Sequence, residues 1–514
     1  MTTTASLSVT ASPRVRYDLA FWGLAAVIAA AMIFVHGRAG MTLPAPWGDE
    51  AYFVWQARAF ERWTHFIAPE LDPTRPVLLL PFTYQALLGL TFKVFGYSIE
   101  LARGLSLVAV LVGFACLALV ARRLSAPIAA LMLIGAFMLN GHFVVMANNA
   151  RMEGVLFAVL CAALLMMQRG RAWTALALLT ISPMIHPNGL LCLAPVAVYA
   201  FVAVRVHTTR PPRDAWLLFG VAALLWLANG LYALSYPAGF MHDIAYRIGE
   251  TRTANKGFEQ LGGWHAIGLV LIALVAVIGA RRKAGIGHLL AFAVGGWLMY
   301  RLRTEQWYEV IGDFTYLLLS LAVLELGVLM AGSPQRLAGL LPKWALATMF
   351  TLCLLVFHLK TDRVKGPFRY FEDLTVDGFR FASEDAYFTA DDRRALETFL
   401  HEQAQTGVRV VEYYPWGDTL LLARDVERDG MRFQIPYFDP LFAAGRDWPW
   451  GYRALPAPQA DLFVIRASSY QPRNLDERLA RVIARAEERS GGSDLATIRT
   501  RDGETWYAVR AAAP

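Results

Sequence analysis

The stretch Pro46-Trp47-Gly48-Asp49-Glu50-Ala51-Tyr52 follows the first long apolar run of the chain, which covers roughly residues 18–36. Two adjacent carboxylates therefore stand at the edge of a hydrophobic segment, in a chain whose apolar runs otherwise contain few charges. A carboxylate near hydrocarbon is costly, and such residues usually serve a function. Asp49 is thus a candidate general base at a membrane surface. The alternative is that Asp49 and Glu50 stabilise the N-terminus of a helix that begins near Ala51.

The composition is that of a membrane protein. Of the 514 residues, 56% are hydrophobic and 17% are charged, whereas soluble proteins contain about 25% charged residues. The hydrophobic excess comes from repeated apolar runs of roughly 16–24 residues, the length that crosses a bilayer. The net charge of +7 lies in short basic clusters between these runs, which is typical of membrane topology and not of nucleic-acid binding. The four cysteines fall inside apolar runs, so no disulfide framework is indicated.

The apolar runs and basic clusters together predict a mainly α-helical, polytopic protein of about 11 transmembrane helices. Residues 1–358 form this domain, with a long loop at 37–97 that carries the acidic pair. Residues 76–95 are apolar enough to cross, but a span there would invert the side of every later basic cluster. We therefore expect residues 51–66 and 76–95 to form helices in the membrane interface. The expected spans are 18–36, 99–121, 126–143, 153–168, 172–185, 189–206, 215–236, 264–280, 286–300, 309–331 and 341–358.

The basic clusters all fall on one side of these predicted spans, and the positive-inside rule assigns that side to the cytoplasm. The acidic pair, the loop at 237–262 and everything after residue 358 fall on the other side. We therefore expect a cytoplasmic N-terminus and chemistry on one non-cytoplasmic face. The clusters are Arg14 and Arg16, Arg122-Arg123, Arg169 and Arg171, Arg205 to Arg213, Arg281 to Lys283, and Arg336 with Lys343.

Residues 359–514 are charged and are punctuated by Pro and Gly, which predicts a small extracytoplasmic α/β domain. Two aromatic stretches, 413–416 and 448–450, either stack on sugar rings or pack against the membrane domain. The elements expected in this domain are helices at 390–405 and 474–489 and strands at 408–413 and 461–465.

Four polar residues at the outer ends of the predicted spans are candidate substrate ligands. Arg75, which precedes Pro76, either reaches lipid headgroups or grips a phosphate with its guanidinium fork. Arg151 and Glu153, at the start of a span, either form a simple ion pair or orient a substrate near Asp49. His186 lies in a Pro- and Gly-containing turn, where it is either a polar turn residue or a group for ligand binding or proton transfer.

Further cations on the outer side run against the positive-inside trend and indicate an anionic partner such as a lipid phosphate. The residues of this outer group are Arg247, Arg252, Lys256, Arg301 and Arg303, with Tyr308 in the same stretch as the last two.

No phosphate-binding glycine loop, zinc pattern or Ser-His-Asp arrangement is convincing in the sequence.

The order of these features resembles the GT-C superfamily of membrane glycosyltransferases, and within it the protein O-mannosyltransferase and lipid A aminoarabinose transferase group. A first span is followed by an outward Asp-Glu loop and by interfacial helices with a basic-Pro step and a Phe-Lys-x-Phe-Gly ending. The likeness covers roughly residues 15–330 and concerns topology more than exact sequence. The matching positions are Asp49-Glu50, Arg75-Pro76, Phe92-Lys93-Val94-Phe95-Gly96, Leu101-Ala102-Arg103, Arg122-Arg123-Leu124 and Arg151-Met152-Glu153.

The resemblance implies an enzyme of the bacterial inner membrane that moves a sugar from a polyprenyl-phosphate donor to a lipid, glycan or protein acceptor. Asp49, with Glu50 beside it, would match the catalytic aspartate, and Glu153 would match an acid at the start of the fourth span. Arg75 would stand where the group has a lysine on the donor phosphate. Thr74 replaces an acid that the family often uses around a metal, so a divalent metal stays open. The alternative class is a carrier or flippase for lipid-linked sugars, whose polar features usually lie near the membrane midplane.

Overall fold

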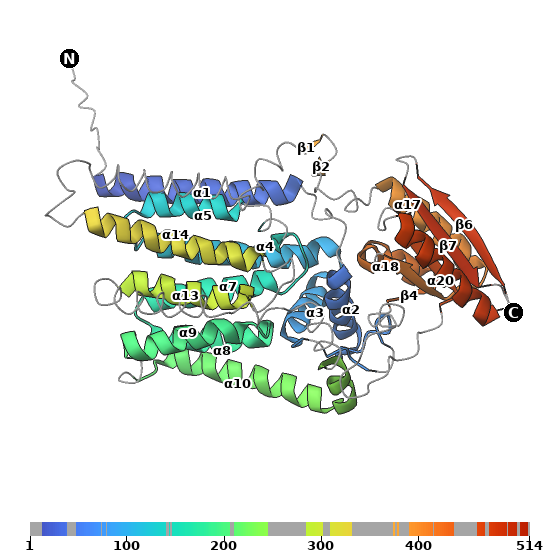
Figure 1. The fold of residues 1–514 in the computed structure, drawn as a ribbon, viewed down its shortest axis with the longest axis horizontal. Helices are drawn as coiled ribbons and strands as arrows, with labels where there is room; N and C mark the ends of the chain where they lie inside the picture. Colours follow the sequence, from blue (N-terminus) through green and yellow to red (C-terminus); the bar gives the residue numbers. More distant parts are fainter. Residues whose placement is uncertain are drawn as a thin grey trace, which may run out of the picture.

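The protein is mainly helical, with a bundle of apolar helices and a small C-terminal sheet (Figure 1). The computed structural model describes residues 13–38, 48–72, 75–78, 80–139, 143, 146–205, 210–244, 284–301, 309–331, 374–375, 378–379, 390–414, 416–435, 460–467, 472–490, 492–500 and 504–511.

The apolar helices of the bundle match the predicted spans closely. Helices α4 (Ile99–Ala121), α7 (Glu153–Gln168) and α8 (Ala172–Ile185) begin and end at the predicted residues. In the described ranges, four helices are long and apolar enough to cross a membrane and five are shorter. The predicted spans at 264–280 and 341–358 lie outside those ranges, so the number of 11 stays a prediction. The remaining bundle helices are α1 (Pro13–Arg38), α5 (Pro127–Met138), α9 (Gly189–Tyr199) with the π-helical turn η1 (Ala200–Val204), α10 (Arg213–Leu234), α13 (Ala284–Arg301) and α14 (Glu309–Ala331).

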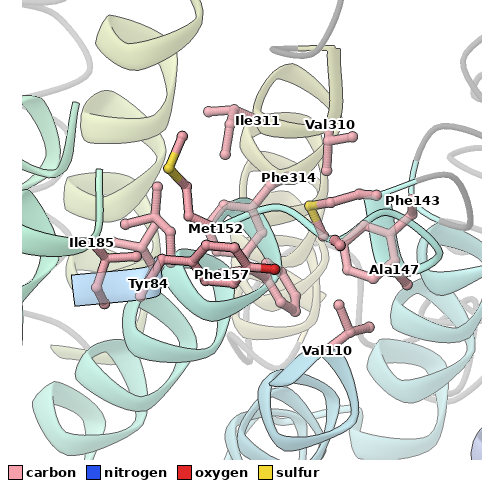
Figure 2. Packing of buried hydrophobic residues seen from close by; sticks show 14 of the residues in the cluster. Tyr84, Val110, Phe143, Ala147, Met152, Phe157, Ile185, Val310, Ile311 and Phe314 are labelled. Carbon is pink, nitrogen blue, oxygen red and sulfur yellow. The ribbon is translucent and has the colours of Figure 1, made fainter. Parts of the chain in front are cut away.

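Small residues and aromatic rings bring the bundle helices together. A Cβ atom at Gly113 of α4 would lie 2.4 Å from the ring of Phe157 in α7, so only glycine permits this close approach. The Phe157 ring in turn meets the rings of Phe143 and Phe314 edge to face, at centroid distances of 4.8 and 5.4 Å. Figure 2 shows these rings in one apolar cluster with Tyr84, which enters from α3.

The two ends of the bundle hold different parts of the chain. At one end the basic loops meet, where Arg122 Nη2 donates to Asp18 Oδ1 at 3.1 Å and Arg123 Nη1 donates to the Gln168 carbonyl at 2.9 Å. At the other end stand α2 (Gly48–Trp63), α3 (Thr83–Phe95) and the C-terminal domain (Figure 1). The assignment of the basic end to the cytoplasm rests on the positive-inside rule.

Helix α2 differs from the interfacial helix expected at residues 51–66. Every residue from Ala51 to Ala59 is at most 5% exposed, so no face of this stretch reaches solvent or lipid. The polar face that the sequence pattern contains is covered by the C-terminal domain. Helix α3 does expose one face, at Leu90, Val94 and Phe95, as a helix in the interface would.

The C-terminal domain contains a five-stranded sheet in the order β4-β3-β5-β7-β6. Strand β3 is parallel to β4 and to the central strand β5, while β7 is antiparallel to β5 and β6. Helix α20 packs on the face that holds Phe463, Ile465 and Val509. The elements are α17 (Ala390–Gln405), β3 (Val410–Tyr414), the 3-10 turn η6 (Trp416–Asp418), α18 (Thr419–Arg428), β4 (Arg432–Gln434), β5 (Leu462–Arg466), α20 (Pro472–Ser490), β6 (Ser493–Arg499) and β7 (Thr505–Ala511), besides the separate pair β1 (Leu374–Thr375) and β2 (Gly378–Phe379).

Tyr413, the first residue of the first aromatic stretch, serves packing in this structure. The Tyr413 side chain is fully buried, its hydroxyl accepts from Trp506 Nε1 at 2.8 Å, and it donates to Asp418 Oδ2 at 3.2 Å. A ring in this position cannot stack on a sugar from solvent. The second stretch, 448–450, lies outside the described residues.

The C-terminal domain meets the outer loop of the bundle at Glu70, whose carbonyl accepts from the Ile435 amide at 2.6 Å. Burial raises the pKa of the Glu70 carboxyl from 4.5 to about 7, although Arg62 and Arg58 oppose the shift. Between these two pKa values the folded protein holds a proton that the unfolded chain has lost. Stability should therefore fall as the pH rises from about 4.5 to about 7 and then level off.

Glu70→Gln is expected to remove this loss, because an amide does not ionise in the buried site. The free energy of unfolding at pH 8 should rise by about 2–3 kcal/mol relative to wild type, and the two proteins should converge near pH 4. Thermal unfolding between pH 4 and 8 measures both quantities. Glu402→Gln, at an exposed position of α17, is the matched control. An equal decline in Glu70→Gln and wild type would contradict the assignment.

Candidate active site

The acidic pair opens helix α2. Asp49 belongs to its first turn, while the Asp49 side chain lies outside what the structure describes. Glu50 is fully buried, and its carboxylate receives Arg103 Nε at 3.0 Å and Nη2 at 2.8 Å. The Ala150 amide donates to the same carboxylate at 2.5 Å. Glu50 thus ties α2 to α4 and to the segment before α7, which favours a structural role for Glu50 beside Asp49.

Arg151 and Glu153 form the ion pair that was one of the two predicted alternatives. Arg151 Nη2 lies 2.9 Å from Glu153 Oε1, and both side chains are less than 10% exposed. The Arg151 carbonyl accepts from Ser106 Oγ at 3.3 Å. Because Ala150 contacts Glu50, this pair stands next to the start of α2. A role in orienting substrate stays a prediction for both residues.

The Arg75 guanidinium forms ion pairs with two carboxylates of the protein, those of Asp243 and Asp72. Its Nη1 and Nη2 atoms donate to the two carboxylate oxygens of Asp243 at 2.9 Å each, and its Nε lies 3.3 Å from Asp72 Oδ2. Nη1 also donates to the Pro76 carbonyl at 3.2 Å. Asp243 lies in the helical residues 237–244, is fully buried, and accepts from the Leu78 amide. A donor phosphate that binds Arg75 must therefore replace one of these contacts.

Arg75→Ala is expected to destabilise the protein, because Asp243 then stays buried without its cation. Breaking a buried ion pair from one side costs about 3–5 kcal/mol of unfolding free energy. Adding Asp243→Asn to the variant should recover at least half of that loss in a thermal unfolding measurement. If the double variant recovers stability but not donor binding, Arg75 also contacts the phosphate. A double variant no more stable than Arg75→Ala would contradict the ion-pair argument.

His186 ends α8 and organises the turn into α9. Its Nδ1 accepts from the Asn188 amide at 3.2 Å, which leaves the proton of the neutral ring on Nε2. Its backbone amide donates to the Ser182 carbonyl, and its carbonyl accepts from the Gly189 amide at 2.8 Å. A Cβ atom at Gly189 would lie 2.4 Å from Ser182 Oγ, so the turn requires glycine there. The ring is 2% exposed, and a role in binding or proton transfer stays a prediction.

The outer cations of the sequence lie mostly beyond the described ranges. Arg301 ends α13, but its side chain is not among the described ones. Arg247, Arg252, Arg303 and Tyr308 fall outside the described residues altogether. Their contact with a lipid phosphate stays a prediction.

Three charged residues at this end of the bundle were not predicted as partners from the sequence. Arg103 holds Glu50, and Asp243 and Asp72 hold Arg75. A signal for Asp243 did exist, since it is an acid in the short apolar stretch that follows the seventh predicted span. Within the described ranges, no group of three or more His, Cys, Asp or Glu side chains comes together as a metal site would need.

No family model matches the sequence, and no curated protein is significantly similar to it. Two crystal structures of ArnT from Cupriavidus metallidurans are similar to the chain. The structure bound to undecaprenyl phosphate has 14% sequence identity and a TM-score of 0.46, and covers 96% of this chain and 98% of that chain. The apo structure has 12% identity and a TM-score of 0.47, with 97% and 98% covered. The chain is thus similar, over nearly its whole length, to a membrane protein of the group that its sequence resembles.

Proposed function

We propose that this protein is a membrane glycosyltransferase that moves a sugar from a polyprenyl-phosphate donor to an acceptor hydroxyl on the non-cytoplasmic face. The position of α2 is the observation that carries the proposal. The helix whose first turn contains Asp49 is buried at the end of the bundle opposite the basic loops. In the proposed reaction, an acid held there meets the donor phosphate at the level of the lipid headgroups.

Asp49 is the general base of the proposed reaction. It takes the proton of the acceptor hydroxyl while the acceptor oxygen forms a bond to the anomeric carbon of the sugar. The bond from that carbon to the phosphate oxygen breaks, and polyprenyl phosphate leaves with the electron pair. Attack from the side opposite the phosphate inverts the anomeric centre. The phosphate is a good leaving group, so the enzyme needs to hold it with cations and to align the acceptor.

The buried ion pairs around α2 position the reacting groups in this mechanism. Glu50 fixes the first turn of α2 to Arg103, and Arg151 with Glu153 supports the adjoining segment. Arg75 reaches the donor phosphate by exchanging a contact with Asp72 or Asp243. The outer cations Arg247, Arg252, Arg301 and Arg303, together with Tyr308 and His186, would complete donor or acceptor binding.

The acceptor and the sugar are open in the proposal, and a lipid, glycan or protein all suit a hydroxyl nucleophile. The rival class is a carrier or flippase for lipid-linked sugars. Such a carrier would place its polar groups near the middle of the membrane. The described ion pairs of the candidate site lie instead at one end of the bundle, which favours the enzyme.

Release of polyprenyl phosphate tests the proposal directly. Purified protein in lipid nanodiscs is incubated with radiolabelled undecaprenyl-phosphate sugars, one pentose and one hexose at a time, and with a membrane-lipid extract as acceptor. We expect labelled sugar to move to the extract and undecaprenyl phosphate to appear in equal amount. Movement of intact donor across a liposome membrane without cleavage would instead identify a carrier.

A further inference from the structure

Helix α2 is held from the side of the bundle by buried polar contacts. Glu50 at its start pairs with Arg103, as described above. On another side of the helix, the Tyr52 hydroxyl and Gln56 Nε2 both donate to the Val77 carbonyl at 2.9 Å. These contacts hold α2 against α4 through Glu50, and against the loop that precedes α3 through Tyr52 and Gln56.

A third side of α2 is held by helix α18 of the C-terminal domain. Trp55 Nε1 donates to Thr419 Oγ1 at 3.2 Å. Arg58 and Arg62 both reach the single carboxylate of Glu427, at 2.7 Å and 2.5 Å. Positions 55, 58 and 62 follow the spacing of one helix face, so the whole outward stripe of α2 meets α18. In Figure 1, α2 stands between the bundle and the C-terminal domain.

Arg58 makes this contact unusually specific. Its guanidinium lies 4.0 Å from the centroid of the Tyr97 ring and 5.2 Å from that of Trp55, and the side chain is 6% exposed. The Tyr97 hydroxyl donates to the Leu420 carbonyl at 2.7 Å, and Arg424 donates to the Tyr97 carbonyl. A buried cation that is stacked on rings and paired with a carboxylate has one preferred position.

We propose that the C-terminal domain is a clamp on α2, and that Glu427 is the positioning residue through which it acts on sugar transfer. The inference rests on the proposed function, because it takes its importance from Asp49 in the first turn of α2. A helix of 16 residues has little stability of its own, so the position of α2 depends on the segments that pack around it. Glu427 forms ion pairs with two arginines that lie one turn apart on α2. These two contacts fix the rotation of α2 about its axis and its position along that axis.

A displaced α2 should impair proton transfer from the acceptor hydroxyl to Asp49 more than it impairs binding of the donor lipid. A shift of the base by about 1 Å lowers a reaction rate by about 100-fold even when binding persists. Loosening α2 at Glu427 should therefore lower kcat and leave the KM for the donor nearly unchanged. A residue that only stabilised the fold would lower the amount of folded protein and leave kcat per folded molecule unchanged.

Glu427→Lys tests the clamp, because it places a cation opposite Arg58 and Arg62. We expect kcat for release of undecaprenyl phosphate to fall on the order of 10-fold or more, with the donor KM within about twofold. Adding Arg62→Glu restores an ion pair and should recover at least half of the loss on a logarithmic scale. Glu402→Lys makes the same charge change on the exposed surface of α17 and should have no effect. Glu427→Gln is the milder variant should Glu427→Lys fold poorly.

Amide hydrogen exchange of residues 50–62 measures the position of α2 independently of activity. Exchange in this stretch should quicken in Glu427→Lys, return in the double variant and stay unchanged in Glu402→Lys. Unchanged exchange in Glu427→Lys would show that α18 does not hold α2, and quicker exchange with normal kcat would show that the clamp does not serve transfer. Either result overturns the inference. If wild type cleaves no donor, the proposed function fails, and the role in transfer inferred for Glu427 fails with it.

Discussion

Asp49→Asn is expected to lower the rate of sugar transfer by about 10²–10⁴-fold, the usual contribution of a positioned general base. Asparagine keeps the size and polarity of the side chain but cannot accept the proton of the acceptor hydroxyl. Donor binding should persist, because the phosphate is held by cations and not by Asp49. Transfer by purified protein, with undecaprenyl-phosphate sugars as donors, measures the first effect. Thermal stabilisation by undecaprenyl phosphate measures the second.

The neighbouring acid supplies the control for this experiment. Glu50→Gln changes one carboxylate to an amide at the next residue, but its carboxylate is paired with Arg103. Glu50→Gln should therefore lower stability, and Asp49→Asn should leave stability within about 0.5 kcal/mol of wild type. Near-normal transfer by Asp49→Asn would remove Asp49 from the mechanism. A large loss of stability in Asp49→Asn would point to the helix-start role that the sequence left open.

The helices of the bundle were predictable because residues at the two ends of an apolar run mark where the helix begins and ends. Helix α4 begins at Ile99, directly after Ser98, whose side-chain hydroxyl accepts from the Leu101 amide at 3.0 Å. It ends at Ala121, before two arginines. Helix α17 likewise begins with two acids, at Asp391 and Asp392, as a helix start favours. These start and end signals lie within a few residues of each helix, so a single sequence is enough to find them.

The ion pairs between distant segments of the chain were not predictable from the same patterns. Arg75 and Asp243 are 168 residues apart, and Arg58 and Glu427 are 369 apart. Local periodicity cannot report which distant segments meet. The burial of α2 depends on this pairing as well, because its sequence alone shows an amphipathic helix with a face for water. Helix α18, with its buried Leu420, Leu422 and Val426, covers that face.

Arg103→Met is expected to have the largest effect on stability. Both members of the Glu50–Arg103 pair are fully buried, with contacts of 3.0 and 2.8 Å. Methionine fills much of the arginine volume but leaves the Glu50 carboxylate without its cation. Taking one partner from a buried pair costs about 3–5 kcal/mol of unfolding free energy. Arg103→Met should therefore be far less stable than wild type in thermal unfolding.

The double variant Glu50→Gln with Arg103→Met separates the ion pair from simple packing. With both charges gone, the desolvation penalty disappears on both sides, and the amide oxygen introduced at position 50 can still accept from the Ala150 amide. Its stability should exceed that of either single variant, with a coupling energy of about 2 kcal/mol or more in the double-mutant cycle. Additive losses would mean that the two charges do not depend on each other. Because the pair fixes the first turn of α2, recovery of stability should also bring back part of the transfer activity that either single variant loses.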